Sequence, residues 1–179
     1  MERVEQAAHM DTGASATQQR ERFIAQLEQH RGIVLKVAGT YAWSASDREE
    51  LAQEITAQLW MAFGRYDAAR PFATWMYRVA LNVAISQTRR SSLRSRHHVP
   101  FDDALHDVPG ALDTGDEPDA RSRALRGFIG RLDPLNRALL LLYLDDRSHR
   151  EIAEVLGISE TNVATKLGRL KQRIRNQIA

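Results

Sequence analysis

The sequence predicts an all-α protein of two small helical domains joined by an acidic, flexible linker. Apolar residues recur at helical spacing on both sides of that linker, and β-branched alternation over strand lengths is absent. The 179 residues suffice for one ordinary domain or two small ones, and are too few for a large enzyme. The chain has no cysteine, which excludes disulfides and thiolate zinc sites and fits a reducing compartment.

Composition places the domain boundary in a stretch that holds three of the five prolines and little periodicity. We expect a disordered tail over residues 1–19, a first domain over 20–96, the linker over 97–120 and a second domain over 121–179. The sequence has neither a signal peptide nor a run of about 18 apolar residues. We therefore expect no membrane contact and a cytoplasmic location.

The first domain should contain four helices, near residues 18–30, 32–43, 47–64 and 73–90. Ser46, followed three residues later by Glu49, predicts a capping box at the start of the third. The second domain should also contain four helices, near residues 121–131, 134–145, 148–156 and 159–177. Asp133 can cap the second of these with Pro134 at its first position, and Ser148 with Glu151 predicts a capping box on the third.

The formal net charge of +2 hides a segregation along the chain. The first domain carries +5, the linker −7 and the second domain +6. Two basic blocks joined by an acidic connector suggest two surfaces for a polyanion.

Residues 149–166 have the spacing of a helix-turn-helix. Ala153 lies where the two helices would touch, Gly157 fits the left-handed turn between them, and Val163 faces the core. Ser159 can cap the last helix. The face of that helix opposite its apolar stripe is polar, and such residues can bond base edges and phosphates in the major groove. The candidate DNA-binding residues are Thr161, Asn162, Thr165, Lys166 and Arg169; a solvated basic face is the alternative for any one of them.

The first domain carries two further segments, DREELAQEI from Asp47 and FATWMYRVALNVA from Phe72. The first segment places acidic side chains on one helix face, which forms an acidic rim on a basic domain. On the second helix, Arg78, Asn82 and Arg89 share a face that could track a DNA strand.

In this order and spacing, the two segments resemble region 2 of the sigma-70 family of bacterial RNA polymerase sigma factors, and the helix-turn-helix resembles region 4. With only these two regions, over roughly residues 20–176, the chain resembles the extracytoplasmic-function class. The resemblance implies a transcription initiation factor that binds core RNA polymerase and promoter DNA, recognises the minus-10 and minus-35 elements and helps promoter melting. It also implies a regulator as a partner, such as an anti-sigma factor.

The resemblance implies that the acidic helix binds the clamp helices of the largest catalytic subunit of core polymerase. The residues concerned are Asp47, Glu49, Glu50, Gln53 and Glu54. Helix capping and the helix dipole explain Asp47 and Glu49 equally well.

The resemblance further implies that the next helix and the loop Arg65–Phe72 before it bind the single-stranded minus-10 element. The residues concerned are Arg70, Arg78, Asn82, Arg89 and Arg90. Asn82 would belong to a pocket for a flipped base, because its amide offers both a donor and an acceptor. The resemblance assigns the minus-35 element to the last helix.

Aromatic side chains at Trp60, Phe63, Phe72 and Trp75 could stack on bases, but their spacing favours a place in the core. Trp43 stays undecided. The alternative function is a stand-alone helix-turn-helix regulator that binds a two-fold operator as a dimer. An enzyme has no support, because the sequence has no metal-ligand cluster, phosphate-binding glycine loop or nucleophile beside a base; we expect no cofactor and no metal.

Overall fold

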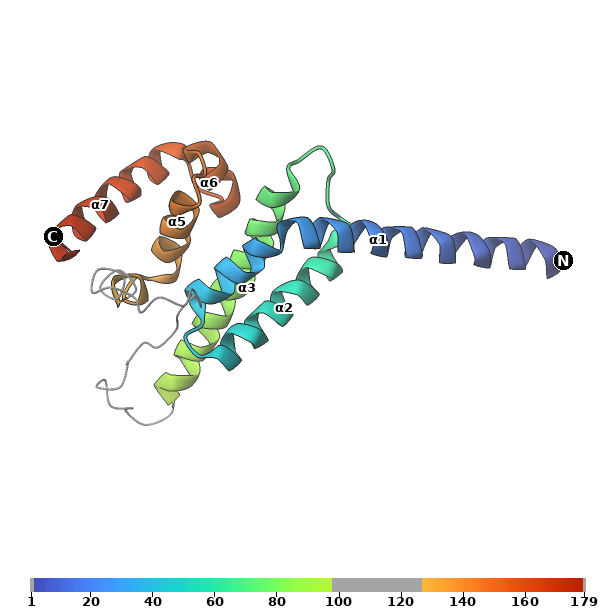
Figure 1. Ribbon diagram of the computed structural model, residues 1–179, viewed down its shortest axis with the longest axis horizontal. Helices are drawn as coiled ribbons and strands as arrows, with labels where there is room; N and C mark the ends of the chain where they lie inside the picture. The colour runs from blue at the N-terminus through green and yellow to red at the C-terminus, as the bar shows by residue number, and fades with distance from the viewer. Residues whose placement is uncertain (1, 98–126, 179) are drawn as a thin grey trace.

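The computed structural model describes residues 2–97 and 127–178, and the side chains of residues 16–90 and 127–176. Every regular element in these ranges is a helix, which confirms the all-α prediction (Figure 1). Residues 98–126 lie outside them and include nearly all of the expected linker.

Three helices form the first domain: α1 (Glu2–Tyr41), α2 (Ala45–Phe63) and α3 (Phe72–His97). Each packs on the other two, and in Figure 1 the N-terminal part of α1 extends well beyond the bundle. The centre of the bundle is fully buried and apolar; it contains Val37, Ile55, Leu59, Met76, Tyr77 and Ala80.

α1 is one continuous helix, so the predicted break between helices near 18–30 and 32–43 is wrong. The apolar stripe continues across Gly32, because Leu27, Val34 and Tyr41 recur every seven residues on the same face. One glycine in a helix costs about 0.5–1 kcal/mol, which is less than burial of one large apolar side chain contributes. α1 also includes residues 2–19, where we expected a disordered tail; the Gln, Ala, Glu and Arg of this stretch favour helix.

α2 begins earlier than predicted, and its cap is a different serine. Ser44 has extended backbone angles, and its hydroxyl accepts a 3.0 Å hydrogen bond from the Asp47 amide. Ser46 lies inside the first turn, so the capping box predicted between Ser46 and Glu49 is wrong. Both Ser44 and Ser46 are residue types that favour the N-cap position. The short connection after Tyr41 ends at Ser44, so Ser44 takes that position.

The second domain contains α5 (Pro134–Leu144), α6 (His149–Leu156) and α7 (Glu160–Ile178). Residues 127–130 are also helical, whereas the rest of the helix predicted near 121–131 lies outside the described residues. The Asp133 side chain accepts from the Asn136 amide with Pro134 at the first position of α5, as predicted. The buried core contains Phe128, Leu139, Leu142, Ile152, Val163 and Leu167.

The two domains are in contact. α5 and α6 pack against α3, and α5 also touches α1, so the helix-turn-helix lies beside the bundle in Figure 1. This contact between the domains does not follow from the sequence analysis.

Candidate nucleic-acid interface

The helix-turn-helix has the predicted local geometry. The Ser148 hydroxyl accepts from the Glu151 amide at 3.2 Å, while the Glu151 carboxylate accepts from the Ser148 amide at 2.9 Å. The Ser148 hydroxyl also donates to this carboxylate at 2.7 Å, and the hydrogen bonds that the carboxylate accepts from the Ser148 hydroxyl and amide hold the pKa of the Glu151 carboxyl below its usual range. Gly157 has a φ of 67°, as the turn requires, and the Ser159 hydroxyl caps α7 at the Asn162 amide.

α7 presents one polar face to solvent. Val163, Leu167 and Leu170 are buried, so the opposite side of the helix faces outward. Of the predicted DNA-binding residues, Lys166 is half-buried and the others are exposed: Thr161, Asn162, Thr165 and Arg169. This face therefore has the exposure that contact with a DNA groove requires.

Two basic residues of α7 pack on rings. Lys171 lies 4.2 Å from the centroid of the Tyr143 ring, and the Arg173 guanidinium lies 5.6 Å from that of Phe128. Such cation–π contacts are worth about 0.5–2 kcal/mol. These two residues therefore pack against the domain core and also add positive charge to α7.

α3 presents the basic face predicted from its sequence. Arg78, Asn82, Ser86, Arg89 and Arg90 are all exposed, whereas the other side of the helix is buried at Met76, Tyr77, Ala80, Leu81 and Ala84. The helix therefore exposes three cations and one amide along a single side.

The loop before α3 is held in place by an aromatic cluster. Tyr66 packs with its ring centroid 5.0 Å from that of Trp75 and 5.2 Å from that of Phe72, and its hydroxyl donates to the Arg70 carbonyl at 2.6 Å. The Asp67 carboxylate accepts from the Ala69 amide. The sequence analysis did not single out Tyr66, although an aromatic residue between Phe63 and Phe72 was the available signal.

The predicted core position is confirmed for Phe72, which is buried. Phe63 and Trp75 are partly buried against the core. The prediction is wrong for Trp60, which is 43% exposed and touches Phe23 by its edge. The buried side of α2 carries Leu51, Ile55 and Leu59, and Trp60 is turned about 100° around the helix from Leu59, which leaves its ring at the edge of the core.

A polar groove runs between α2 and α3. It brings together residues that the sequence assigned to two different partners. Glu50, Gln53 and Glu54 line it from α2, and Asn82 and Arg90 line it from α3. Gln58 also lines the groove and donates to Glu54 at 3.0 Å, whereas Gln87 has a buried side-chain oxygen without a hydrogen-bond partner. Asp47 and Glu49 are exposed nearer the start of α2 and do not line it.

Comparisons with known proteins settle the family. Residues 27–94 match Sigma-70 region 2, and residues 122–174 match Sigma-70, region 4. The chain is 30% identical over 164 residues to the ECF RNA polymerase sigma factor RpoE of Cereibacter sphaeroides, which covers 87% of this chain and 82% of that protein. The chain belongs to the extracytoplasmic-function class of the sigma-70 family. As a sigma factor it is a transcription initiation factor that directs RNA polymerase to promoters.

Other similarities agree with this assignment. The sigma factor is 25% identical over 139 residues to a probable RNA polymerase sigma factor, RfaY of Xanthomonas campestris, but spans only 34% of that protein. Its fold matches RpoE of Bartonella quintana, solved in complex with the anti-sigma factor NepR, with a TM-score of 0.60. That match has 16% identity and covers 88% of this chain and 94% of the solved one. The match of the first domain to Sigma-70 region 2 disfavours a stand-alone helix-turn-helix regulator, because the first domain of such a regulator would be unrelated to sigma factors.

Two negative findings concern only the described ranges. None of the helices there is both long and apolar enough to cross a membrane. No group of three or more acidic or histidine side chains in those ranges could hold a metal ion.

The sequence analysis missed one buried cation of the sigma factor. Arg137 in α5 is only 6% exposed and donates to the carbonyls of Gly130 and Leu132 at 2.8 and 3.3 Å. Its guanidinium lies over the rings of Tyr41 and Trp43, which gives Trp43 a packing role. No local pattern around Arg137 signals this, because the rings come from the other domain.

Proposed function

We propose that this sigma factor is a non-catalytic, cytoplasmic and dissociable subunit of RNA polymerase with three binding surfaces. The α2 side of the groove binds core polymerase, the α3 side binds the minus-10 element, and α7 reads the minus-35 element. The observation that carries the proposal is the groove, because one cleft joins an acidic helix to a basic one in the region 2 domain.

The core-binding surface consists of exposed polar side chains on α2: Asp47, Glu49, Glu50, Gln53 and Glu54. Gln53 donates weakly to Glu49 at 3.4 Å, and the carboxylate oxygens keep further sites for a partner's cations. Asp47 also favours the start of the helix, because its carboxylate lies in the first turn. Its loss should therefore affect stability as well as binding.

The minus-10 surface combines a basic track with one amide. Arg78, Arg89 and Arg90 would neutralise phosphates along α3, and Arg70 would do so from the ordered loop. Asn82 lies within the groove, where its amide could hydrogen-bond the edge of an unstacked base.

The minus-35 surface is the exposed face of α7. Thr161, Asn162 and Thr165 offer hydroxyl and amide groups, and Arg169 can make a bidentate contact with a guanine. Lys166 is half-buried and suits a phosphate contact. Thr165 already donates to the Thr161 carbonyl at 2.9 Å, so its hydroxyl acts on DNA chiefly as an acceptor.

An anti-sigma factor is the regulator that we propose for this protein. The support is its likeness in fold to Bartonella quintana RpoE, which was solved with NepR.

Reconstitution with the host's core polymerase tests the proposal, with run-off transcription from a pool of genomic promoter fragments. The double variant Glu50→Gln with Glu54→Gln should bind core at least about tenfold more weakly, because two charges leave one face. Glu28→Gln, an exposed glutamate on α1, is the control. If the parent, the double variant and the Glu28→Gln control bind core polymerase equally well, α2 is not part of the core interface.

A further inference from the structure

The polar groove between α2 and α3 has a partly buried floor and an exposed rim. Val83 and Gln87, one helical turn apart on α3, and Gln58 of α2 are partly buried. The charged and amide side chains of the rim are exposed: Glu50 and Glu54 on α2, and Asn82 and Arg90 on α3. The groove holds about 780 Å³, within the range of roughly 300–1,000 Å³ that pockets for small ligands span. It can therefore admit a group as large as one nucleotide.

Gln87 is the unusual residue of the floor. Its side-chain oxygen is buried and has no hydrogen-bond partner among the described residues. Most buried polar atoms in proteins are hydrogen-bonded, because a buried acceptor without a donor raises the free energy of the folded state. The amide of Gln58, the other one on the floor, donates instead to Glu54 at 3.0 Å. The Gln87 oxygen is therefore an acceptor available to a donor from a bound partner.

The charges on the rim indicate what kind of partner binds here. Arg90 is the only cation among the described residues that line the groove, and its exposed guanidinium suits a phosphate. Glu50 and Glu54 repel a phosphate from the α2 side and so direct it toward Arg90. An arginine or lysine inserted by a protein partner would instead be repelled by Arg90. A nucleotide fits better, since its phosphate is an anion and its base carries N–H donors.

The four bases differ in the group that the Gln87 oxygen requires. Adenine, cytosine and guanine each carry an exocyclic amine, which donates, whereas thymine has an acceptor oxygen at both exocyclic positions. A site built to bond an N–H group rejects a ligand that lacks it, because the buried acceptor then stays unpaired. A thymine oxygen beside the Gln87 oxygen would also bring two acceptors together. The floor of the groove therefore favours an amine-bearing base over thymine.

We propose that Gln87 is a specificity-determining residue of the minus-10 surface: its buried oxygen accepts a hydrogen bond from the exocyclic amine of an unstacked adenine, cytosine or guanine, and thymine is rejected. The inference rests on the minus-10 surface proposed above. Asn82 holds the same base from the rim, and Arg90 neutralises its phosphate. The base lies on the α3 side of the groove, which leaves the carboxylates of α2 to core polymerase. A base that is already unstacked is the form that such a site can bind.

The variant Gln87→Met tests this role, because it keeps the length of the side chain and removes its hydrogen-bonding groups. The Gln87 oxygen is unpaired in the free protein, so the temperature of unfolding should equal that of the parent or exceed it. A glutamine that stabilised the bundle through a hydrogen bond would give a lower temperature when replaced. Gln29→Met, on the exposed side of α1, is the matched control.

DNA binding is measured with holoenzyme reconstituted from core polymerase and each protein. The probes are dye-labelled single strands that carry the minus-10 region of a promoter active in the run-off assay. Each amine-bearing base is replaced in turn by its analogue without the amine: purine for adenine, hypoxanthine for guanine and 2-pyrimidinone for cytosine. At one position we expect the parent and Gln29→Met to lose at least about threefold in affinity, and Gln87→Met to lose nothing. Thymine at that position should be disfavoured by the parent to at least the same extent.

A loss that is the same in the parent and in Gln87→Met at every position would overturn the inference. The scan with the parent alone keeps the test decisive if Gln87→Met does not fold, because an amine that matters nowhere contradicts the proposal equally. A preference for thymine at the sensitive position would also overturn it, since the amide would then present its nitrogen. Weaker core binding by Gln87→Met, with unchanged discrimination between bases, would assign Gln87 to the protein interface instead.

The double variant Arg78→Ala with Arg90→Ala separates this inference from the minus-10 surface itself. If the double variant binds the single strand as tightly as the parent does, the minus-10 surface is assigned wrongly. If it binds more weakly while no position responds to Gln87→Met, the surface stands and only the role of Gln87 is refuted.

Discussion

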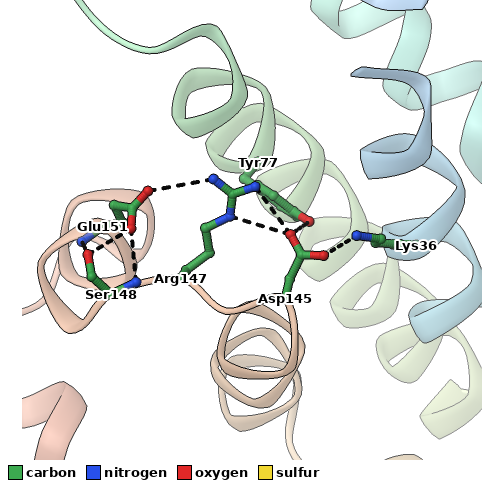
Figure 2. Close-up of polar contacts among 6 residues, drawn as sticks. All are labelled: Lys36, Tyr77, Asp145, Arg147, Ser148 and Glu151. Atoms are coloured by element: carbon green, nitrogen blue, oxygen red, sulfur yellow. Dashed lines mark hydrogen bonds and ion pairs between the residues drawn. The ribbon is translucent and has the colours of Figure 1, made fainter. Parts of the chain in front are cut away.

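The Tyr77 hydroxyl donates a 2.7 Å hydrogen bond to the Asp145 carboxylate, across 68 positions of sequence and between two domains (Figure 2). Burial raises the pKa of Tyr77, and the bond to Asp145 raises it further, so the phenol stays a donor at neutral pH. Burial alone would raise the pKa of the Asp145 carboxyl as well, but hydrogen bonds from Lys36, Tyr77 and Arg147 hold it below its usual range.

This lowered pKa makes the contribution of Asp145 to stability depend on pH. A carboxyl whose pKa is lower in the folded state stabilises above its unfolded pKa of about 4, and the contribution is lost as the pH falls through the folded value. We expect Asp145→Asn to unfold at lower denaturant concentration than the parent at pH 7, with a smaller difference at pH 3. Chemical unfolding of both proteins at the two pH values measures this. A difference that grows toward low pH would contradict it.

Arg137→Ala should destabilise the protein by about 2–4 kcal/mol. The change leaves the Gly130 and Leu132 carbonyls without their donor and removes the cation from two rings. Chemical unfolding with Arg131→Ala, an exposed neighbour, as the control measures the effect. A decrease in the free energy of unfolding of less than about 0.5 kcal/mol would contradict this prediction, because that is the effect expected of an ordinary surface substitution.

Two glycines of the helix-turn-helix should respond in opposite directions to replacement by alanine. Gly157 has a φ of 67°, so Gly157→Ala should cost about 1–2 kcal/mol in backbone strain. Gly168 lies inside α7 with open space around a new Cβ, so Gly168→Ala should stabilise by about 0.5–1 kcal/mol. Thermal unfolding distinguishes them, and destabilisation by Gly168→Ala would refute the second expectation.

Asn82→Ala should impair promoter opening more than core binding. The Asn82 side chain lines the same groove as Glu54, so a base-binding role and a core-binding role are separable only by experiment. Permanganate reactivity of the melted promoter and core affinity, each compared with Ser86→Ala one turn along the same face, provide the measurement. Equal loss of both activities would assign Asn82 to the core interface.

Arg169→Ala should weaken minus-35 recognition by about 1–3 kcal/mol if the guanidinium contacts a base in bidentate fashion. Competition between duplexes with intact and altered minus-35 sequences measures this loss of discrimination. Arg175→Ala, in the last turn of α7, should instead weaken binding to all sequences alike. The same uniform loss for Arg169→Ala would show a phosphate contact.

Local features of this sigma factor follow from its sequence. The caps at Asp133, Ser148 and Ser159 and the turn at Gly157 depend on residues three or four positions apart, so the sequence alone predicts them. The exposed faces of α3 and α7 follow from helical periodicity in the same way. The cap of α2 was missed because two serines satisfied one local rule.

Only the tertiary structure decided how distant segments meet. Lys36 pairs with Asp145 across 109 positions, and Trp43 and Tyr41 cover Arg137 in the other domain. The groove likewise depends on the distance between α2 and α3, which periodicity does not specify. Sequence periodicity determines which side of a helix is apolar, whereas shape and charge complementarity between whole helices determine which surface covers it. The sequence therefore determined the helices and the polar faces of this protein, and packing between its domains determined which of those faces stay free.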